Sequence, residues 1–241
     1  MAYSLRIAHS RWPFPSYLLS PSAIRHKLIP MLSWLKPAVF LACLFPFGQL
    51  AFKAYTSDLG VNPIEFITHF TGDWVLIFLL ATLSVTPLRK ITGWNDLIKF
   101  RRMLGLFAFF YALLHFSTYL VLDLFFDFQR IAKDILKRPY VTVGFTAFVL
   151  MIPLVITSTA GMIRRLGKRW QQLHRLVYVA ALAGVIHFYW LVKADIRRPL
   201  QYEIVLAVLL GYRLFVHWTP FGVLRVSKKP SVRPRLESQS E

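Results

Sequence analysis

Six apolar runs, each close to the length that crosses a lipid bilayer as a helix, constrain this 241-residue chain more than any other feature. A membrane-spanning helix needs roughly 17–25 mainly apolar residues, and it satisfies its backbone polar groups within itself. The runs cover residues 38–54, 70–86, 103–122, 141–157, 173–192 and 202–217. They predict an all-α fold, a polytopic membrane bundle of about six transmembrane helices.

Proline and charge distinguish some of these runs from the others. Pro46 and Pro153 lie inside the first and fourth runs, where the missing backbone N–H is expected to bend the helix. Pro87 follows the second run and is expected to end its helix. The sixth run is the weakest, because it contains Glu203 and Arg213 and ionised side chains are costly inside a bilayer.

The chain is strongly basic, with 29 Lys and Arg against 11 Asp and Glu and a formal net charge of +18. In a soluble protein this charge would favour nucleic acid as a partner. Here the basic residues lie between apolar runs, which argues against nucleic acid and for membrane lipid. Nineteen of them lie in the termini and loops on one side of the predicted bundle, and eight lie on the other. The positive-inside rule therefore predicts two cytoplasmic termini in a multi-pass protein of the bacterial inner membrane.

The sequence divides into three parts. Residues 1–36 form a basic N-terminal extension, residues 37–218 the transmembrane domain, and residues 219–241 a basic cytoplasmic tail that we expect to be disordered. The extension lacks the apolar segment and cleavage site of a secretory signal. It is either a segment at the membrane interface or the product of a start codon assigned too early, with Met31 as the true start. The single cysteine, Cys43, excludes an intrachain disulfide and any cysteine-rich metal site.

Two histidines lie at nearly the same depth in different apolar runs. His115 is about 18 Å from the inner end of the third run, and His187 is about 21 Å from the inner end of the fifth. An ionisable side chain at such a depth usually pairs or binds something. One interpretation is a neutral imidazole hydrogen-bonded across the bundle. The other, which the matching depth favours, is that the two rings supply both axial ligands of a haem iron.

A third histidine, His174, lies near the inner end of the fifth run, where it could hold a second cofactor. Its spacing from His187 separates the two by about 20 Å along a helix and by roughly 140° around it. They share no face of a regular helix unless the helix is distorted, for which Gly184 is a candidate position. The pair of His115 and His187 is therefore the better supported site.

Several arginines lie where the acidic groups of a cofactor could meet them. Arg101 and Arg102 precede the third run, and Arg164 and Arg169 precede the fifth. Guanidinium groups bind carboxylates and phosphates, so haem propionates or a flavin phosphate are candidate ligands. The positive-inside rule explains most of these arginines without any ligand.

The remaining histidines carry weaker expectations. His69 precedes the second run at its outer end. It either faces a periplasmic partner or a quinone head group, or it is an interfacial capping residue. The capping interpretation is slightly preferred. His217 ends the sixth run and is expected to be interfacial. His9 and His26 lie in the extension, and no role is assigned to them.

Several segments match the motifs of a known family. They are Arg101-Arg102-Met-Leu-Gly105, Tyr111-Ala-Leu-Leu-His115, Leu166-Gly-Lys-Arg-Trp-Gln-Gln-Leu-His174, Ile186-His187-Phe-Tyr-Trp190 and His69-Phe-Thr-Gly72. Over residues 32–218 the chain resembles the MsrQ (YedZ) family, which belongs to the ferric-reductase-like transmembrane cytochromes. The resemblance implies that residues 37–218 form a haem domain and that His115, His174 and His187 are its haem ligands.

The same resemblance implies a function. Members of the family are haem b subunits that take electrons from the quinone pool, with a cytoplasmic flavin reductase as a further donor and FMN as a second cofactor. They pass the electrons to MsrP, a periplasmic molybdopterin enzyme that reduces methionine sulfoxide in oxidised proteins. The catalytic site for methionine sulfoxide would lie on that partner, and this chain would be an electron-transfer subunit of an oxidoreductase complex.

Two other functions remain as alternatives. A haem b ferric reductase subunit would use the same histidines with a different electron acceptor. The chain contains no Gly-x-Gly-x-x-Gly motif, so we expect the dinucleotide site of any such system on another protein. A small membrane transporter with histidine-lined sites is the alternative from another class. A transporter would be indicated by broken membrane helices at corresponding positions in two related halves of the chain. Pro46 and Pro153 are only weak evidence for such breaks, because no internal repeat accompanies them.

Overall fold

The computed structural model describes residues 21–192 and 195–218, with side chains for residues 34–192 and 195–216. Residues 1–20 of the predicted extension and the whole predicted tail, residues 219–241, lie outside the described residues, as do the side chains of His26 and His217. The described part of the extension is helical. Helix α1 (Pro21–Tyr55) begins well before the first apolar run and continues through it.

Helices account for most of the described residues, and no strand occurs among them. After α1 come α2 (Pro63–Thr92), α3 (Ile98–Ser117), α4 (Phe128–Lys137), α5 (Pro139–Ile156), α6 (Ala160–Leu166), α7 (Lys168–Leu173), α8 (Leu176–Leu191) and α9 (Arg197–Trp218). A short 3₁₀-helix (Asn95–Leu97) precedes α3, and a π-helical turn (Thr118–Asp123) extends it. Six of the helical segments are long and apolar enough to cross a membrane. The predicted all-α bundle of six transmembrane helices is confirmed.

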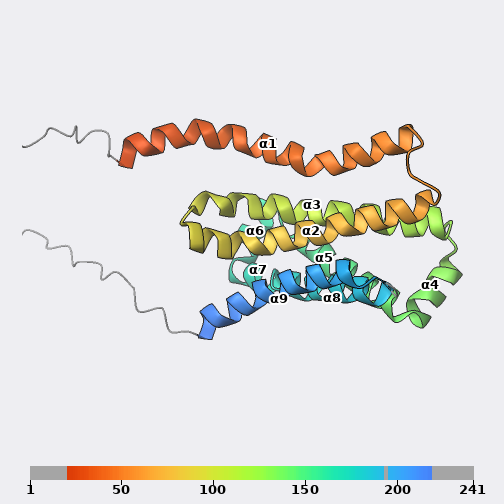
Figure 1. The fold of residues 1–241 in the computed structure, drawn as a ribbon. Coiled ribbons are helices and arrows are strands. Elements are labelled where there is room, and N and C mark those ends of the chain that lie inside the picture. Colours follow the sequence, from red (N-terminus) through yellow and green to blue (C-terminus); the bar gives the residue numbers. More distant parts are fainter. Residues whose placement is uncertain (1–20, 193–194, 219–241) are drawn as a thin grey trace, which may run out of the picture.

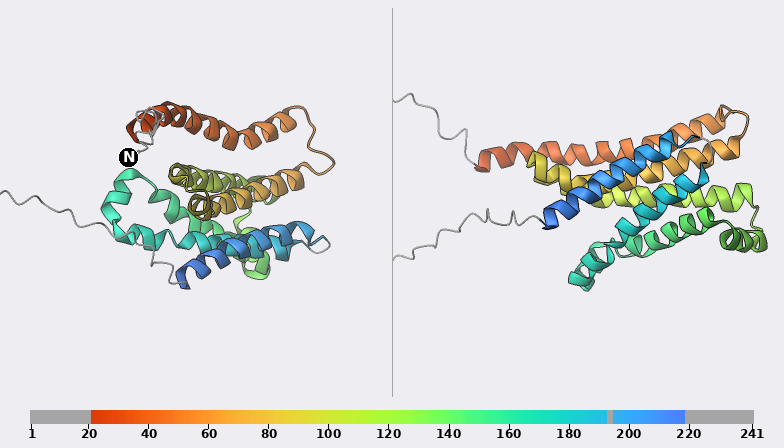
Figure 2. Two further views of the ribbon diagram at one scale, coloured as in Figure 1. Left: turned by 60° about the vertical axis from the view of Figure 1, so that its left-hand side comes forward. Right: turned by 60° about the horizontal axis from the view of Figure 1, so that its bottom comes forward.

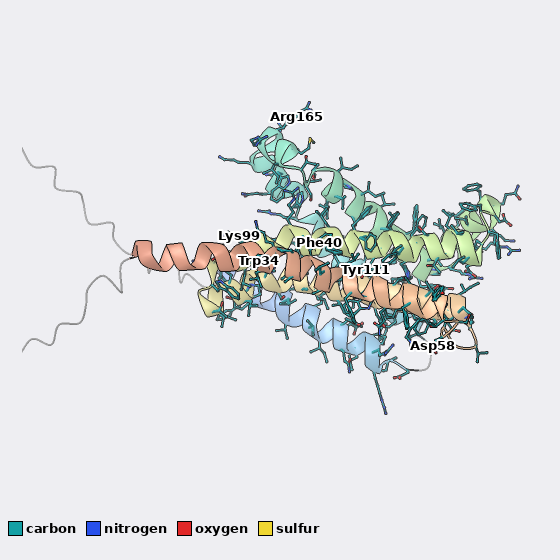
Figure 3. All side chains as sticks on the ribbon, turned by 90° about the horizontal axis from the view of Figure 1, so that it is seen from above. Trp34, Phe40, Asp58, Lys99, Tyr111 and Arg165 are labelled. Atoms are coloured by element: carbon teal, nitrogen blue, oxygen red, sulfur yellow. The ribbon has the colours of Figure 1, made fainter. Side chains whose placement is uncertain are left out.

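The long helices lie side by side along one axis (Figure 1). Helix α2 packs along α3, α5 packs along α8, and α9 lies against both α2 and α8. Helix α1 lies on the outside of the bundle next to α3 (Figures 1 and 2). The start of α1 and the end of α9 share one end of the bundle, the terminal end. Helix α4, the α1–α2 loop, the end of α8 and the start of α9 lie at the opposite, far end (Figure 1). In Figure 3, Lys99 lies toward the terminal end and Asp58 at the far end.

A buried tyrosine holds α1 on the bundle beside Pro46. The Tyr111 side chain on α3 is fully buried, and its hydroxyl donates to the carbonyl of Cys43 at 3.0 Å. The same hydroxyl accepts from the backbone N–H of Phe47 at 3.0 Å. Cys43 and Phe47 would pair directly in a regular helix, so the hydroxyl of Tyr111 is inserted into the hydrogen-bond ladder beside Pro46. Figure 3 shows Tyr111 beneath α1, close to Phe40 on that helix.

Helix α2 does not end at Pro87, so that prediction is wrong. The helix runs five residues further, to Thr92, and ends at Gly93, whose φ of 71° is the left-handed conformation that glycine adopts without strain. A proline inside a helix has no N–H group, so the carbonyl four residues earlier lacks its backbone hydrogen-bond donor. Here that carbonyl belongs to Leu83, whose side chain is fully buried.

Arg213 on α9 supplies the missing donor. Its Nη2 donates to the Leu83 carbonyl at 2.6 Å, its Nη1 donates to the hydroxyl of Tyr178 on α8, and the guanidinium lies 4.8 Å from the centre of that tyrosine ring. An arginine that weakened the sixth run as a membrane span therefore joins α2, α8 and α9. Polar side chains inside membrane proteins are tolerated when they face the bundle and find partners in this way.

We expect Arg213→Met to lower the free energy of unfolding by about 1–3 kcal/mol, because it leaves the Leu83 carbonyl buried without this donor. In a Pro87→Ala background, residue 87 has an N–H that can reach Leu83, so the same substitution should cost less than half as much. Unfolding of the four proteins by SDS in mixed micelles measures the difference. Equal losses in both backgrounds would contradict the link between Pro87 and Arg213.

Candidate functional site

Two imidazoles from different helices meet inside the far half of the bundle. His115 lies near the end of α3 and His187 near the end of α8, and both helices run toward the far end. Their ring centres are 6.2 Å apart, and their ring planes cross at 79°. The structure thus brings together the two histidines that the depth argument paired.

Each ring is held by a backbone carbonyl of a neighbouring helix. The Nδ1 atom of His115 lies 2.9 Å from the carbonyl oxygen of Thr68 on α2 and 3.4 Å from the hydroxyl of Thr71. The Nδ1 atom of His187 lies 2.7 Å from the carbonyl oxygen of Tyr140 on α5. A carbonyl can only accept, so the proton of each neutral imidazole is on Nδ1. Each Nε2 then carries a lone pair and has no hydrogen bond to a described residue, the arrangement that metal-binding histidines use.

Two glycines make room for these rings. A Cβ atom on Gly72 of α2 would lie 3.2 Å from Cε1 of His115, and one on Gly144 of α5 would lie 2.6 Å from Nδ1 of His187. Both glycines are one turn after the carbonyl that holds the ring, on the same helix. Each neighbouring helix therefore offers the imidazole a hydrogen-bond acceptor and, four residues later, a position without a side chain.

The donor set fits a haem iron. A metal–imidazole bond is about 2 Å long and a ring centre lies about 1 Å behind its nitrogen, so two imidazoles on one metal ion have centres about 6 Å apart. The observed 6.2 Å agrees with that spacing. Among the residues whose side chains are described, no group of three or more His, Cys, Asp or Glu could hold a metal ion by itself. Two imidazoles are sufficient for haem, because the porphyrin supplies four further nitrogens.

His174 lies toward the terminal end, at the start of the segment that leads into α8. It lies at the break between α7 and α8. Helix α8 is continuous through Gly184, so that position does not provide the distortion that a common face with His187 would need. Its Nδ1 atom is 3.1 Å from the carbonyl oxygen of Trp170, and its ring stacks on the Trp170 ring at 3.9 Å. The carbonyl of Leu154 also interacts with the ring. Its Nε2 is buried and makes no hydrogen bond to any part of the chain that the structure describes, which leaves it available to a ligand.

The four arginines predicted to meet acidic groups are spread over the terminal end. Arg101, on the first turn of α3, is half-buried and within electrostatic reach of His174. Arg102, Arg164 and Arg169 are exposed on α3, α6 and α7. None of the four forms an ion pair with an acidic side chain in the described segments. Only Arg101 is thus brought close to a predicted ligand, and in Figure 3 the neighbouring Arg165 on α6 projects away from the bundle.

Sequence reasoning missed the residues that position the histidines. Thr68 and Tyr140 act through backbone carbonyls, which no residue type signals. In the sequence Gly72 stands out only as part of the motif from His69 to Gly72, and Gly144 belongs to no motif. A search for small residues on helices facing a buried histidine could have found both glycines, because close approach of two helices requires them.

Comparisons with known proteins find a matching family and several relatives of high sequence identity. Residues 71–185 match the family described as "Ferric reductase like transmembrane component". The chain is 56% identical over 196 residues to the "Protein-methionine-sulfoxide reductase heme-binding subunit MsrQ" of Herminiimonas arsenicoxydans, covering 80% of this chain and 90% of that protein. It is 53% identical over 185 residues to the protein of that name from Azospira oryzae (76% and 79% covered). The corresponding protein of Xanthomonas euvesicatoria is 47% identical over 205 residues (83% and 93% covered). No solved structure matches the chain.

We expect Gly144→Ala to destabilise the protein by about 1–3 kcal/mol, because the new methyl group would overlap the His187 ring and force it off the Tyr140 carbonyl. Gly211→Ala is the matched control, since a Cβ atom there meets nothing within 4 Å and alanine favours the helix. SDS unfolding of both variants measures the difference. If Gly144→Ala were as stable as Gly211→Ala, the close packing at His187 would be refuted.

Proposed function

Since the chain belongs to the MsrQ family of heme-binding membrane subunits, within the ferric-reductase-like proteins, we propose that it carries electrons to a methionine-sulfoxide reductase. In this proposal the electrons come from the quinone pool, pass through haem b, and reach MsrP, a molybdopterin enzyme of the periplasm. That partner repairs oxidised methionines of periplasmic proteins. The chain is a multi-pass protein of the bacterial inner membrane, a location that supports transfer from a quinone donor to a periplasmic acceptor.

The observation that carries the proposal is the His115–His187 pair, with both Nδ1 protons held by carbonyls and both Nε2 atoms free of hydrogen bonds to described residues. When bound there, haem would supply a one-electron carrier. The protein's own contribution is the rest. The backbone carbonyls of Thr68 and Tyr140 fix the tautomer and the orientation of the two rings. Ligands that are already oriented need little rearrangement when the charge on an iron changes.

We propose a second cofactor position at His174. Its buried Nε2, which lacks a hydrogen bond within the described chain, and the nearby Arg101 support that assignment. Arg102, Arg164 and Arg169 would meet haem propionates or the phosphate of FMN at the same end of the bundle. FMN, and a cytoplasmic flavin reductase as a further electron donor, are part of this proposal by family membership.

The charge distribution supports an orientation for these two sites. With nineteen Lys and Arg residues assigned to the terminal-end side and eight to the other, both termini are proposed to be cytoplasmic. The His115–His187 pair then lies toward the periplasm, where MsrP docks. His174 lies toward the cytoplasm, where a soluble flavin reductase could reach it.

Purified from haem-replete cells, the protein should show a Soret band and the reduced α and β bands of a b-type haem. His115→Ala and His187→Ala should each abolish the low-spin spectrum of one haem, because each removes one axial ligand. Absorption spectra with pyridine-haemochrome quantification and flavin analysis test this. A colourless wild-type preparation would refute the redox function and favour the transporter alternative.

His174→Ala separates the two proposed positions. We expect it to leave the low-spin spectrum of the His115–His187 site unchanged and to lower the amount of cofactor per protein, because only the terminal-end ligand is lost. The same haem and flavin quantification provides the measurement. If His174→Ala abolished the low-spin spectrum while His115→Ala and His187→Ala did not, the pairing of the histidines would be wrong.

A further inference from the structure

A cavity of about 590 Å³ lies at the far end of the bundle, between α2, α8 and α9 and beneath the α1–α2 loop. Its size is within the range of sites that bind small organic molecules. Phe66, Phe70 and Phe188 line one part of it, and the acid–base side chains of α2 line another. Nothing in the proposed haem positions uses this cavity.

The acid–base side chains on α2 form a column from the exposed entrance inward. Glu65, His69 and Asp73 are spaced four residues apart, so they lie along one face of the helix. Their side chains are 62%, 43% and 22% exposed in that order. His69 Nε2 is 3.9 Å from the Glu65 carboxylate. The column thus places an imidazole and a second, more exposed carboxylate along the helix face that leads outward from the half-buried carboxylate of Asp73.

The innermost member, Asp73, is held by two groups from α9. Nη1 of Arg198 donates to one carboxylate oxygen at 3.4 Å, and the Tyr202 hydroxyl donates to the other at 3.4 Å. These contacts join α2 to α9 and orient the carboxylate at the cavity wall. The ion pair between Asp73 and Arg198 has a structural role, because it joins α2 to α9. That role does not account for the cavity next to Asp73 or for the column of acid–base side chains that leads out from it.

The cavity and the histidine pair share a wall. Thr68, which holds His115, is followed by His69, and Gly72, which makes room for His115, is followed by Asp73. On α8, His187 is followed by Phe188, which lines the cavity. A molecule in the cavity would therefore be separated from the imidazoles by about the thickness of one helix, roughly 10 Å.

We propose that this far-end cavity binds a quinol and is where it is oxidised, an assignment that rests on the proposed function and gives it a donor site. The aromatic side chains would pack on the quinol ring, while Asp73 and His69 accept the protons of its two hydroxyl groups and Glu65 passes them to water. The two O–H bonds break, one quinol becomes one quinone, and two protons leave through the column. The two electrons would leave one at a time to the haem that His115 and His187 would hold, which would supply a one-electron carrier toward the periplasmic acceptor.

Two measurements on the full-length, haem-loaded protein in nanodiscs test this proposal. The first is photolabelling with an azido-ubiquinone analogue followed by mass spectrometry. The label should be found on α2 between Asn62 and Asp73 or around Phe188 and Arg198, and unlabelled quinone should compete with it. Labelling confined to another part of the chain would overturn the assignment.

The second measurement is the rate at which a short-chain ubiquinol reduces the haem in a stopped-flow instrument. Asp73→Asn and His69→Gln should slow it by about a hundredfold, the usual contribution of a positioned proton acceptor. The spectrum after dithionite reduction should be unchanged, which shows that the haem site is intact. Asp58→Asn is the matched control, because Asp58 is an exposed far-end carboxylate paired with Lys53 and does not line the cavity.

The remaining outcomes each overturn a definite statement. If both variants are reduced by ubiquinol at the wild-type rate, the column takes no part in quinol oxidation and the proposal fails. If they slow only the delivery of electrons to the periplasmic partner, the cavity is a docking surface for that protein instead. If no ubiquinol reduces the wild-type haem, the quinone pool is not the donor, and the proposed function itself fails on that point.

Discussion

A carbonyl or N–H group released from a helix inside a bilayer needs a partner from the protein, because lipid offers none. This constraint explains the main contacts between the helices. Beside Pro46 the hydroxyl of Tyr111 hydrogen-bonds to both the Phe47 N–H and the Cys43 carbonyl, and so joins α1 to α3. At Pro87 the guanidinium of Arg213 bonds the released carbonyl, and so fastens α9 to α2. Irregular backbone on one helix is matched by a polar side chain on another.

The same chemistry builds the candidate site. His115 and His187 donate from Nδ1 to the carbonyls of Thr68 and Tyr140, so each ring joins two helices as Tyr111 does. The Tyr111 hydroxyl donates its only proton in such a contact, whereas an imidazole that donates from Nδ1 still has a second nitrogen, Nε2. The bond that stabilises the bundle also fixes which nitrogen carries the proton, and it leaves the other as a potential ligand. Packing and cofactor binding would therefore depend on one set of hydrogen bonds.

The spans and the meeting of His115 with His187 could be predicted from the sequence because they follow from length alone. The length of an apolar run matches the thickness of a bilayer, and the constant rise per residue of a helix gives the depth of each residue within the membrane. The end of α2 could not be predicted in this way, since the rule for proline describes an isolated helix and Arg213 lies 126 residues further along the chain. The carbonyls that hold the histidines were equally inaccessible, because every residue has one and only the fold selects which is used.

The positions of the proposed sites bear on how far electrons must travel. The cavity, the His115–His187 pair and the proposed docking side for MsrP all lie toward the far end of the bundle. A quinol oxidised there would deliver electrons across about one helix to the first haem, and that haem would face the acceptor on the same side. No electron from quinol would then need to cross the membrane. His174 would be required only for an electron donor at the terminal end. The two histidine sites would then serve different electron donors and would not be consecutive carriers in one electron-transfer chain.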